Sequence, residues 1–319
     1  MSPWYRSGIA LLMWLGCEPS AHATYFEDAP LAMRSPAPAK SLRLSPVPAA
    51  TSYDSGWSLS VLVQGASIYA LNETYELDYY RMDYGLLLEF SPNERWQLSL
   101  GHTLGRSDDA HLDQLSLTFH DLFGIGQNGR DQVPKHRFMS RFPEYGLAQD
   151  DFSSRTLSRQ TELGVGFRWW QRERHQMSSR VTVQYHQGPT LWRGGGRWDQ
   201  ALQWDYGYHT QRHRFNAMAA LSHSGAQRVL AAPVRPYQWH LALGYRFQWH
   251  PRHSMELQYL VSQGGLKRAA ELSKSTHEIA LAYRFRYQRL CWQLGVLQNS
   301  VHADNSADVA FQTALRYLF

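Results

Sequence analysis

The chain has 319 residues, of which 13% are aromatic and only 18% are charged, and its formal net charge is +5. Beyond the N-terminus, no stretch offers the roughly 20 continuous apolar residues that a spanning helix requires, which excludes a helical membrane protein. The charge is small and no basic run is interleaved with aromatic residues, so the sequence gives no sign of a nucleic-acid partner.

Residues 1–23 are predicted to be a secretory signal peptide. Arg6 provides the charged start, residues 9–15 form the apolar stretch, and an Ala-His-Ala sequence ending at Ala23 forms the cleavage site. An alternative makes Cys17 the lipidated first residue of the exported protein. In either case the protein is expected to leave the cytoplasm.

Residues 24–55 are rich in proline, alanine and serine and show no sustained period. We interpret them as a periplasmic lead-in to a β-barrel that spans residues 56–319. After cleavage at Ala23, Cys291 is the only cysteine left, so no intramolecular disulfide can form. The barrel must therefore be held by its strand pairing and packing.

From residue 56 onward, apolar and polar side chains alternate with a period of two, which predicts strands with one apolar and one polar face. The clearest example runs from Tyr237 to Trp249, where every odd position is apolar and both ends are aromatic. An apolar band between two aromatic girdles is typical of a transmembrane barrel. The sequence thus predicts an all-β fold, a closed antiparallel barrel in the cell outer membrane.

The connections between these strands also alternate in length. Short ones are predicted near Pro92, Gln211, Pro251 and Arg289, and longer polar or glycine-rich ones lie between them. Short periplasmic turns and longer external loops are typical of outer-membrane barrels. The last strand ends on Phe319, and a terminal aromatic residue in this position resembles the signal read by the outer-membrane assembly machinery.

The number of strands follows from parity. Counting every alternating segment, including residues 112–120, gives an odd number, whereas single-chain bacterial barrels have an even number. We therefore predict about twelve strands and a long segment, residues 105–155, that folds over or into the external mouth. A barrel of about fourteen strands is the alternative, with an additional spanning strand near residues 138–147, where Pro143 interrupts the alternation.

Two stretches resemble a family of outer-membrane proteins known as a domain of unknown function. One is the closing part from Trp239 to Phe319. The other runs from Asn72-Glu73-Thr74-Tyr75 through Leu112-Asp113 to Phe119-His120-Asp121-Leu122-Phe123-Gly124, with Arg130 and Pro134 just after. The resemblance implies an outer-membrane barrel and leaves the activity open.

Charged side chains on the polar face are the candidates for a function in the lumen. Asp113, His120, Asp121 and Arg130 of the long segment would bind a solute or gate the barrel, or would simply pair to hold the segment still. The strands would carry further charges inward. The inward arginines would line a solute path or form structural ion pairs with Asp83, Asp205, Glu256 and Glu278. They are Arg81, Arg168, Arg180, Arg246, Arg284, Arg286 and Arg316.

The sequence contains no metal cluster, nucleotide loop or Cys/His ligand pattern, so no metal and no cofactor is expected. A lipid-modifying hydrolase, an esterase or deacylase, is the alternative function, and His223 with Ser224 is the nearest match to its chemistry. In the predicted strand register His223 faces lipid and Ser224 faces the opposite side, which argues against such a pair. We therefore expect a porin-like, non-enzymatic protein whose partners are outer-membrane lipid, the assembly machinery and a small polar solute.

Overall fold

The computed structural model describes residues 29–110, 112, 118, 121, 134 and 136–319, and the predicted signal peptide and Cys17 lie outside these residues. The described strands form one antiparallel sheet. Their bounds are β1 Gly56–Asn72, β2 Tyr75–Asn93, β3 Trp96–Arg106, β4 Met139–Phe142, β5 Leu147–Asp150, β6 Thr156–Arg172, β7 His175–Gln187, β8 Arg193–His209, β9 His213–Val229, β10 Ala232–Pro233, β11 Tyr237–His250, β12 His253–Ser262, β13 Thr276–Tyr287, β14 Leu290–Val301 and β15 Val309–Leu318.

Twelve of these strands close into a barrel, because β1 pairs with β2 on one side and with β15 on the other. The predicted closed antiparallel barrel of about twelve strands is therefore confirmed. The alternative of about fourteen strands is wrong. Residues 139–150 form only the short hairpin of β4 and β5, which Pro143–Tyr145 interrupts with a turn of 3-10 helix.

The strand register places apolar side chains outside and polar side chains inside. Arg246 of β11 lies opposite Glu256 of β12, and both are buried, whereas Leu243 on the other face is 64% exposed. Pleated strands send successive side chains to opposite faces, so the same division holds along each strand. A slip of one residue would reverse every side chain, which explains why the alternation specifies the register so strongly.

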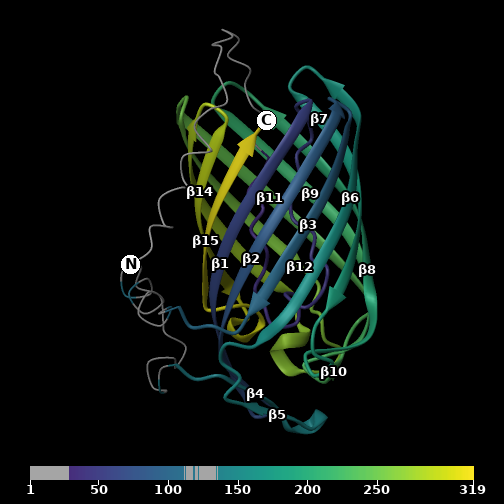
Figure 1. Cartoon of the computed structure of the whole chain (residues 1–319), viewed down its shortest axis with the longest axis vertical. Helices are drawn as coiled ribbons and strands as arrows, with labels where there is room; N and C mark the ends of the chain where they lie inside the picture. Colours follow the sequence, from purple (N-terminus) through teal and green to yellow (C-terminus); the bar gives the residue numbers. More distant parts are fainter. Residues whose placement is uncertain (1–28, 111, 113–117, 119–120, 122–133, 135) are drawn as a thin grey trace, which may run out of the picture.

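The two ends of the barrel differ (Figure 1). The end that carries the C-terminus, which we call the turn end, holds the tight β2–β3, β6–β7, β8–β9, β11–β12 and β13–β14 connections. The opposite end, which we call the loop end, holds the β4–β5 hairpin, β10 and the 3-10 turns Ala270–Ser273 and Ala303–Asn305. The longer connections therefore gather at the loop end, although the β1–β2 turn at residues 73–74 of that end is also tight.

Residues 29–55, which we call the inner segment, lie inside the barrel and not beneath it. Leu31 and Met33 are fully buried, and the backbone of the segment is bonded to side chains of strands on opposite sides of the wall, among them Arg284 of β13 and Gln160 of β6. The expected periplasmic lead-in is thus corrected for these residues. Its composition lacked a strand pattern because the wall, and not a neighbouring strand, satisfies its backbone groups.

The described part of residues 105–155 lies at the loop end. Strand β4 extends the sheet by pairing with β2 at residues 76–78, beyond the point where β3 ends. Leu112 packs against Tyr80 and Met82, whose side chains lie on the outward face of β2. Among the residues that the structure describes, no helix is long and apolar enough to cross a membrane.

Candidate functional site

The inner segment enters the lumen near the turn end, where a buried carboxylate holds it. Glu256 accepts a hydrogen bond of 2.8 Å from the backbone N–H of Leu31 and forms ion pairs with Arg246 at 3.1 Å and Arg284 at 3.2 Å. Arg246 and Arg284 also donate to the carbonyl of Ala29, at 3.2 and 2.6 Å. The side chain of Glu256 is fully buried, so these donors replace the water that the carboxylate has lost.

A second charged contact lies halfway along the wall. Arg34 of the inner segment forms a two-pronged ion pair with Glu162 of β6. Gln184 of β7 donates to the same carboxylate at 2.7 Å. The carboxylate therefore has donors from the wall and from the inner segment, and this contact ties the first part of the inner segment, residues 29–37, to β6 and β7.

The tip of the inner segment reaches the loop end. Arg81 of β2 and Gln160 of β6 both donate to the carbonyl of Ser41, at 3.3 and 2.7 Å. Arg43 donates to the carbonyls of Gly265 and Arg235, at 3.1 and 2.6 Å. The tip is thus held by both the wall and the loops that follow β9 and β12.

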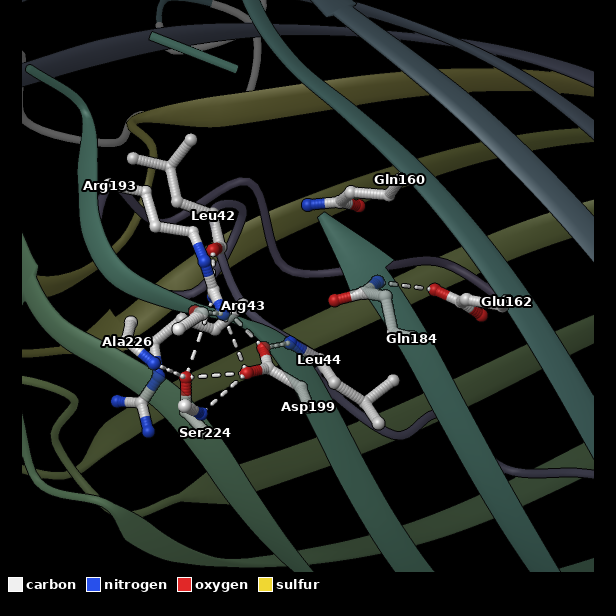
Figure 2. Close-up of polar contacts among 12 residues, drawn as sticks. Leu42, Arg43, Leu44, Gln160, Glu162, Gln184, Arg193, Asp199, Ser224 and Ala226 are labelled. Atoms are coloured by element: carbon white, nitrogen blue, oxygen red, sulfur yellow. Dashed lines mark hydrogen bonds and ion pairs between the residues drawn. The ribbon is translucent and has the colours of Figure 1, made fainter. Parts of the chain in front are cut away.

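Beside the tip, Arg193 and Asp199 of β8 form a buried ion pair at 2.7 Å (Figure 2). Arg193 donates to the carbonyl of Leu42 at 2.8 Å, and Asp199 accepts the N–H of Leu44 at 2.9 Å. Ser224 of β9 donates to Asp199 at 2.7 Å. The pair is nearly inaccessible to water and binds the inner segment at the two residues that flank Arg43.

Residues 44–55 of the inner segment, which we call the descending arm, return to the turn end along β6, β7 and β8. Gln203 donates to the carbonyl of Val47 at 2.9 Å, and Asp205 accepts the N–H of Ala49 at 3.0 Å. Thr51 then donates to Gln176 at 2.9 Å. Along its course, the inner segment therefore exchanges backbone hydrogen bonds mainly with wall side chains.

The loop end is closed by an apolar cap. Leu230 and Leu266, from the connections after β9 and β12, are fully buried, and Trp192 packs on Phe152 with ring centroids 4.9 Å apart. Tyr145 donates from its hydroxyl to the carbonyl of Arg268 at 2.7 Å, which links the β4–β5 hairpin to the cap. Loss of solvent and the nearby Glu144 carboxylate raise the pKa of this phenol, so it remains a donor.

A cavity of about 210 Å³ remains in the lumen between the inner segment and the wall. A single water needs roughly 10–15 Å³ of such space, so the cavity is large enough for a small solute. Its polar wall includes Ser99 of β3, Glu162 of β6 and Arg180 and Thr182 of β7. The inner segment covers the other side.

The sequence-predicted arginines lie on the inward face of the wall, where Arg81 pairs with Asp83 at 2.8 Å and Arg246 and Arg284 share Glu256. Arg286 is half-buried on the same face of β13 as Arg284. Of these four, only Arg284 lines the large cavity. Sequence reasoning missed their shared feature: Arg81, Arg246 and Arg284 each donate to a carbonyl of the inner segment.

Of the four binding residues predicted in the long segment, the structure describes only Asp121. Asp113, His120 and Arg130 lie outside the described residues, and Asp121 is exposed. No described residue between positions 107 and 155 lines the large cavity. The signal that could have found the lumen segment is instead the run of prolines and small residues before β1, which suits an extended chain.

His223 and Ser224 lie on opposite faces of β9, as the alternation predicted. On the outward face, the ring of His223 packs against that of Tyr237 with centroids 4.9 Å apart, and Ser224 on the inward face donates to Asp199. The structure does contain a serine–histidine contact, between Ser222 and Nε2 of His240 at 2.9 Å, but both side chains are buried behind the inner segment. Neither pair places a serine and a histidine together on the outward face. Among the described residues, no His, Cys, Asp and Glu side chains cluster as a metal site.

The closed twelve-strand wall and the polar lumen define a β-barrel with the fold of outer-membrane channels. Residues 9–319 match the family described as protein of unknown function (DUF3187), and the chain belongs to this family. The predicted resemblance to an outer-membrane family known as a domain of unknown function is thereby confirmed. No curated protein sequence matches the chain.

Two solved structures share the fold. An outer-membrane channel from Pseudomonas putida F1 is 11% identical with a TM-score of 0.54, and the alignment covers 84% of this chain and 97% of that one. The NanC porin is 8% identical with a TM-score of 0.50, and the alignment covers 82% of this chain and all (100%) of that one. At these identities the likeness concerns the architecture alone.

Proposed function

We propose that this protein is a non-enzymatic outer-membrane barrel that binds a small polar solute and lets it pass when the inner segment moves. The turn end faces the periplasm and the loop end faces the exterior, as is usual for bacterial barrels. Likeness in fold to an outer-membrane channel and a porin supports this orientation and location.

The outward face supports placement in a membrane. Leu163, Leu243 and Leu294 are 60%, 64% and 42% exposed, and similar side chains occur on every barrel strand. A continuous apolar band this extensive exceeds the patches that soluble monomers expose, and it would be unfavourable in water. Contact with lipid hydrocarbon removes that cost.

One observation carries the proposal of passage: the wall holds the inner segment through polar side chains and not through strand pairing. Gln160, Gln203 and Arg284 donate to its carbonyls, and Glu256 and Asp199 accept its N–H groups. Water or a polar solute can satisfy the same groups once the segment withdraws. The wall would then line a hydrated path, because its inward face is polar along most strands.

A reversible lock tests whether movement of the inner segment opens the barrel. A Cβ at Gly207 of β8 would lie 3.4 Å from the Cβ of Thr51, which is close to the separation found in disulfides. We therefore substitute Thr51→Cys and Gly207→Cys in a Cys291→Ser background. A second lock, Ala39→Cys with Gly265→Cys, holds the tip, where the corresponding Cβ separation is 3.1 Å.

The measurement is solute-dependent conductance in a planar bilayer, before and after reduction. We expect both locked proteins to be silent when oxidised and to conduct like the Cys291→Ser protein after reduction. The Thr51→Cys single variant controls for the substitution and the reductant. Equal conductance in the oxidised and reduced states would show that the inner segment does not control passage, and silence in every state would refute a channel.

The proposed binding and passage require no covalent chemistry. The hydrolase alternative loses its basis because His223 and Ser224 lie on opposite faces of β9. Measured release of fatty acid from outer-membrane phospholipid vesicles by the purified protein would contradict the non-enzymatic proposal.

A further inference from the structure

The large cavity has two chemically different sides. Its inner-segment side is mostly apolar and includes Leu44, Val47 and Ala50 of the descending arm, although Arg34 also lines it. Its wall side carries the polar side chains of Ser99, Arg180 and Thr182, from the two strands β3 and β7 that flank β6. A ligand that fills this space must therefore combine an apolar body with a polar group.

Arg180 is the cation that the cavity leaves without a close counter-charge. Its guanidinium donates to the side chains of Ser99, at 3.1 Å, and Gln97. Among the described residues, no carboxylate lies within the 4.0 Å of an ion pair with Arg180. A guanidinium has five N–H donors, so donors remain for a further acceptor.

The carboxylates that act on Arg180 from farther away have donors of their own. Glu162 is paired with Arg34 and accepts from Gln184. Asp205 accepts the N–H of Ala49 and both its oxygens accept from Gln203. Among the described arginines that line the cavity, Arg180 is therefore the one that has no carboxylate within ion-pair distance.

The other arginines that line the cavity have carboxylate partners. Arg316 pairs with Glu89 at 3.0 Å, and Arg284 pairs with Glu256 at 3.2 Å. The guanidinium of Arg180 lies close to a glycine of the neighbouring strand: a Cβ at Gly164 of β6, which pairs with Thr182, would lie 3.2 Å from a guanidinium nitrogen of Arg180. The glycine lets the guanidinium lie against β6 beside the cavity.

We infer that the cavity binds a small organic anion, with its carboxylate on the guanidinium of Arg180 and its apolar body against residues 44–50. The inference rests on the proposed function, since it names the class of solute that the lumen takes. Arginine suits this role because its planar fork matches a carboxylate and its charge is permanent. A partly desolvated site strengthens the attraction.

Calorimetric titration of benzoate into the full-length protein in detergent tests the inference. We expect saturable binding of benzoate and none of benzamide, which has a similar shape without the charge. Arg180→Gln should weaken benzoate binding by roughly tenfold or more, the loss expected for a hydrogen bond to a charged group. Arg180→Lys should retain part of the affinity because it keeps the charge.

Arg159→Gln is the matched control, because it removes one positive charge from the exposed face of the neighbouring strand β6. Should Arg180→Gln lose the heat-modifiable folded form, Thr182→Phe provides a second variant that fills the cavity and leaves Arg180 in place. We expect Thr182→Phe to abolish binding and Arg159→Gln to leave it unchanged.

Three results would overturn the inference: no benzoate binding, equal binding of benzamide, or equal affinity in Arg180→Gln and Arg159→Gln. The bilayer experiment separates this failure from that of the proposed function. Conductance without anion preference refutes the anion site and leaves the channel. Arg180-dependent binding in a barrel that never conducts supports the site and refutes passage.

Discussion

Neutralising Asp199 should uncouple the inner segment from the wall at its tip. Asp199→Asn keeps the shape of the side chain but leaves the charge of Arg193 buried, since the two side chains are only 1% and 2% exposed. Removing one partner of a buried ion pair costs about 3–5 kcal/mol, because the remaining charge is uncompensated. The hydrogen bond from the N–H of Leu44 is also weakened, which adds about 1 kcal/mol.

The assay is urea unfolding of the refolded barrel in detergent, followed by tryptophan fluorescence and by heat-modifiable migration. Asp150→Asn provides the control, because Asp150 pairs with Arg141 at a similar 2.9 Å but both side chains are 44–47% exposed. Exposed pairs contribute only about 0–1 kcal/mol. If the two variants lower the free energy of unfolding equally, the buried pair does not hold the structure in the way we describe.

Two further predictions concern the membrane and assembly. Leu243→Arg should destabilise the lipid-inserted barrel by about 2–4 kcal/mol, whereas Trp249→Arg, near the turn end, should cost about 0–1 kcal/mol; equal values in reversible unfolding from vesicles would contradict the lipid-facing assignment. Deletion of Phe319, which is 59% exposed and donates its N–H to the carbonyl of Trp57 at 3.0 Å, should reduce the heat-modifiable protein in cells. Normal insertion of the truncated protein would show that the terminal aromatic residue is not the assembly signal.

Much of the barrel follows from the sequence because alternation is a local property. The odd positions between Tyr237 and Trp249 are apolar, and only one of the two faces of a strand can hold them. Parity then selected about twelve strands, and Pro143 marked the place where residues 138–147 do not span. These inferences needed no knowledge of which strands are neighbours.

The position of residues 29–55 inside the lumen could not be inferred from alternation. Residues 29–55 have no period, and the groups that bind their backbone come from Gln160, Asp199 and Glu256, which are far apart in the chain. The same sequence outside the barrel would be an ordinary proline-rich linker. Closure of the wall is what brings these side chains around one segment.

The exceptional position of Arg180 was also decided by tertiary structure. The sequence identifies it only as one of several inward arginines, all of which could have been paired. Arg34, which pairs with Glu162, comes from the inner segment, and Asp205 is engaged by Ala49 of the same segment and by Gln203. Local alternation thus determined which side chains face inward. Contacts between distant residues decided that Arg180, among the described arginines lining the cavity, has no carboxylate within ion-pair distance. Ion pairing depends on distances in space, which periodicity does not encode.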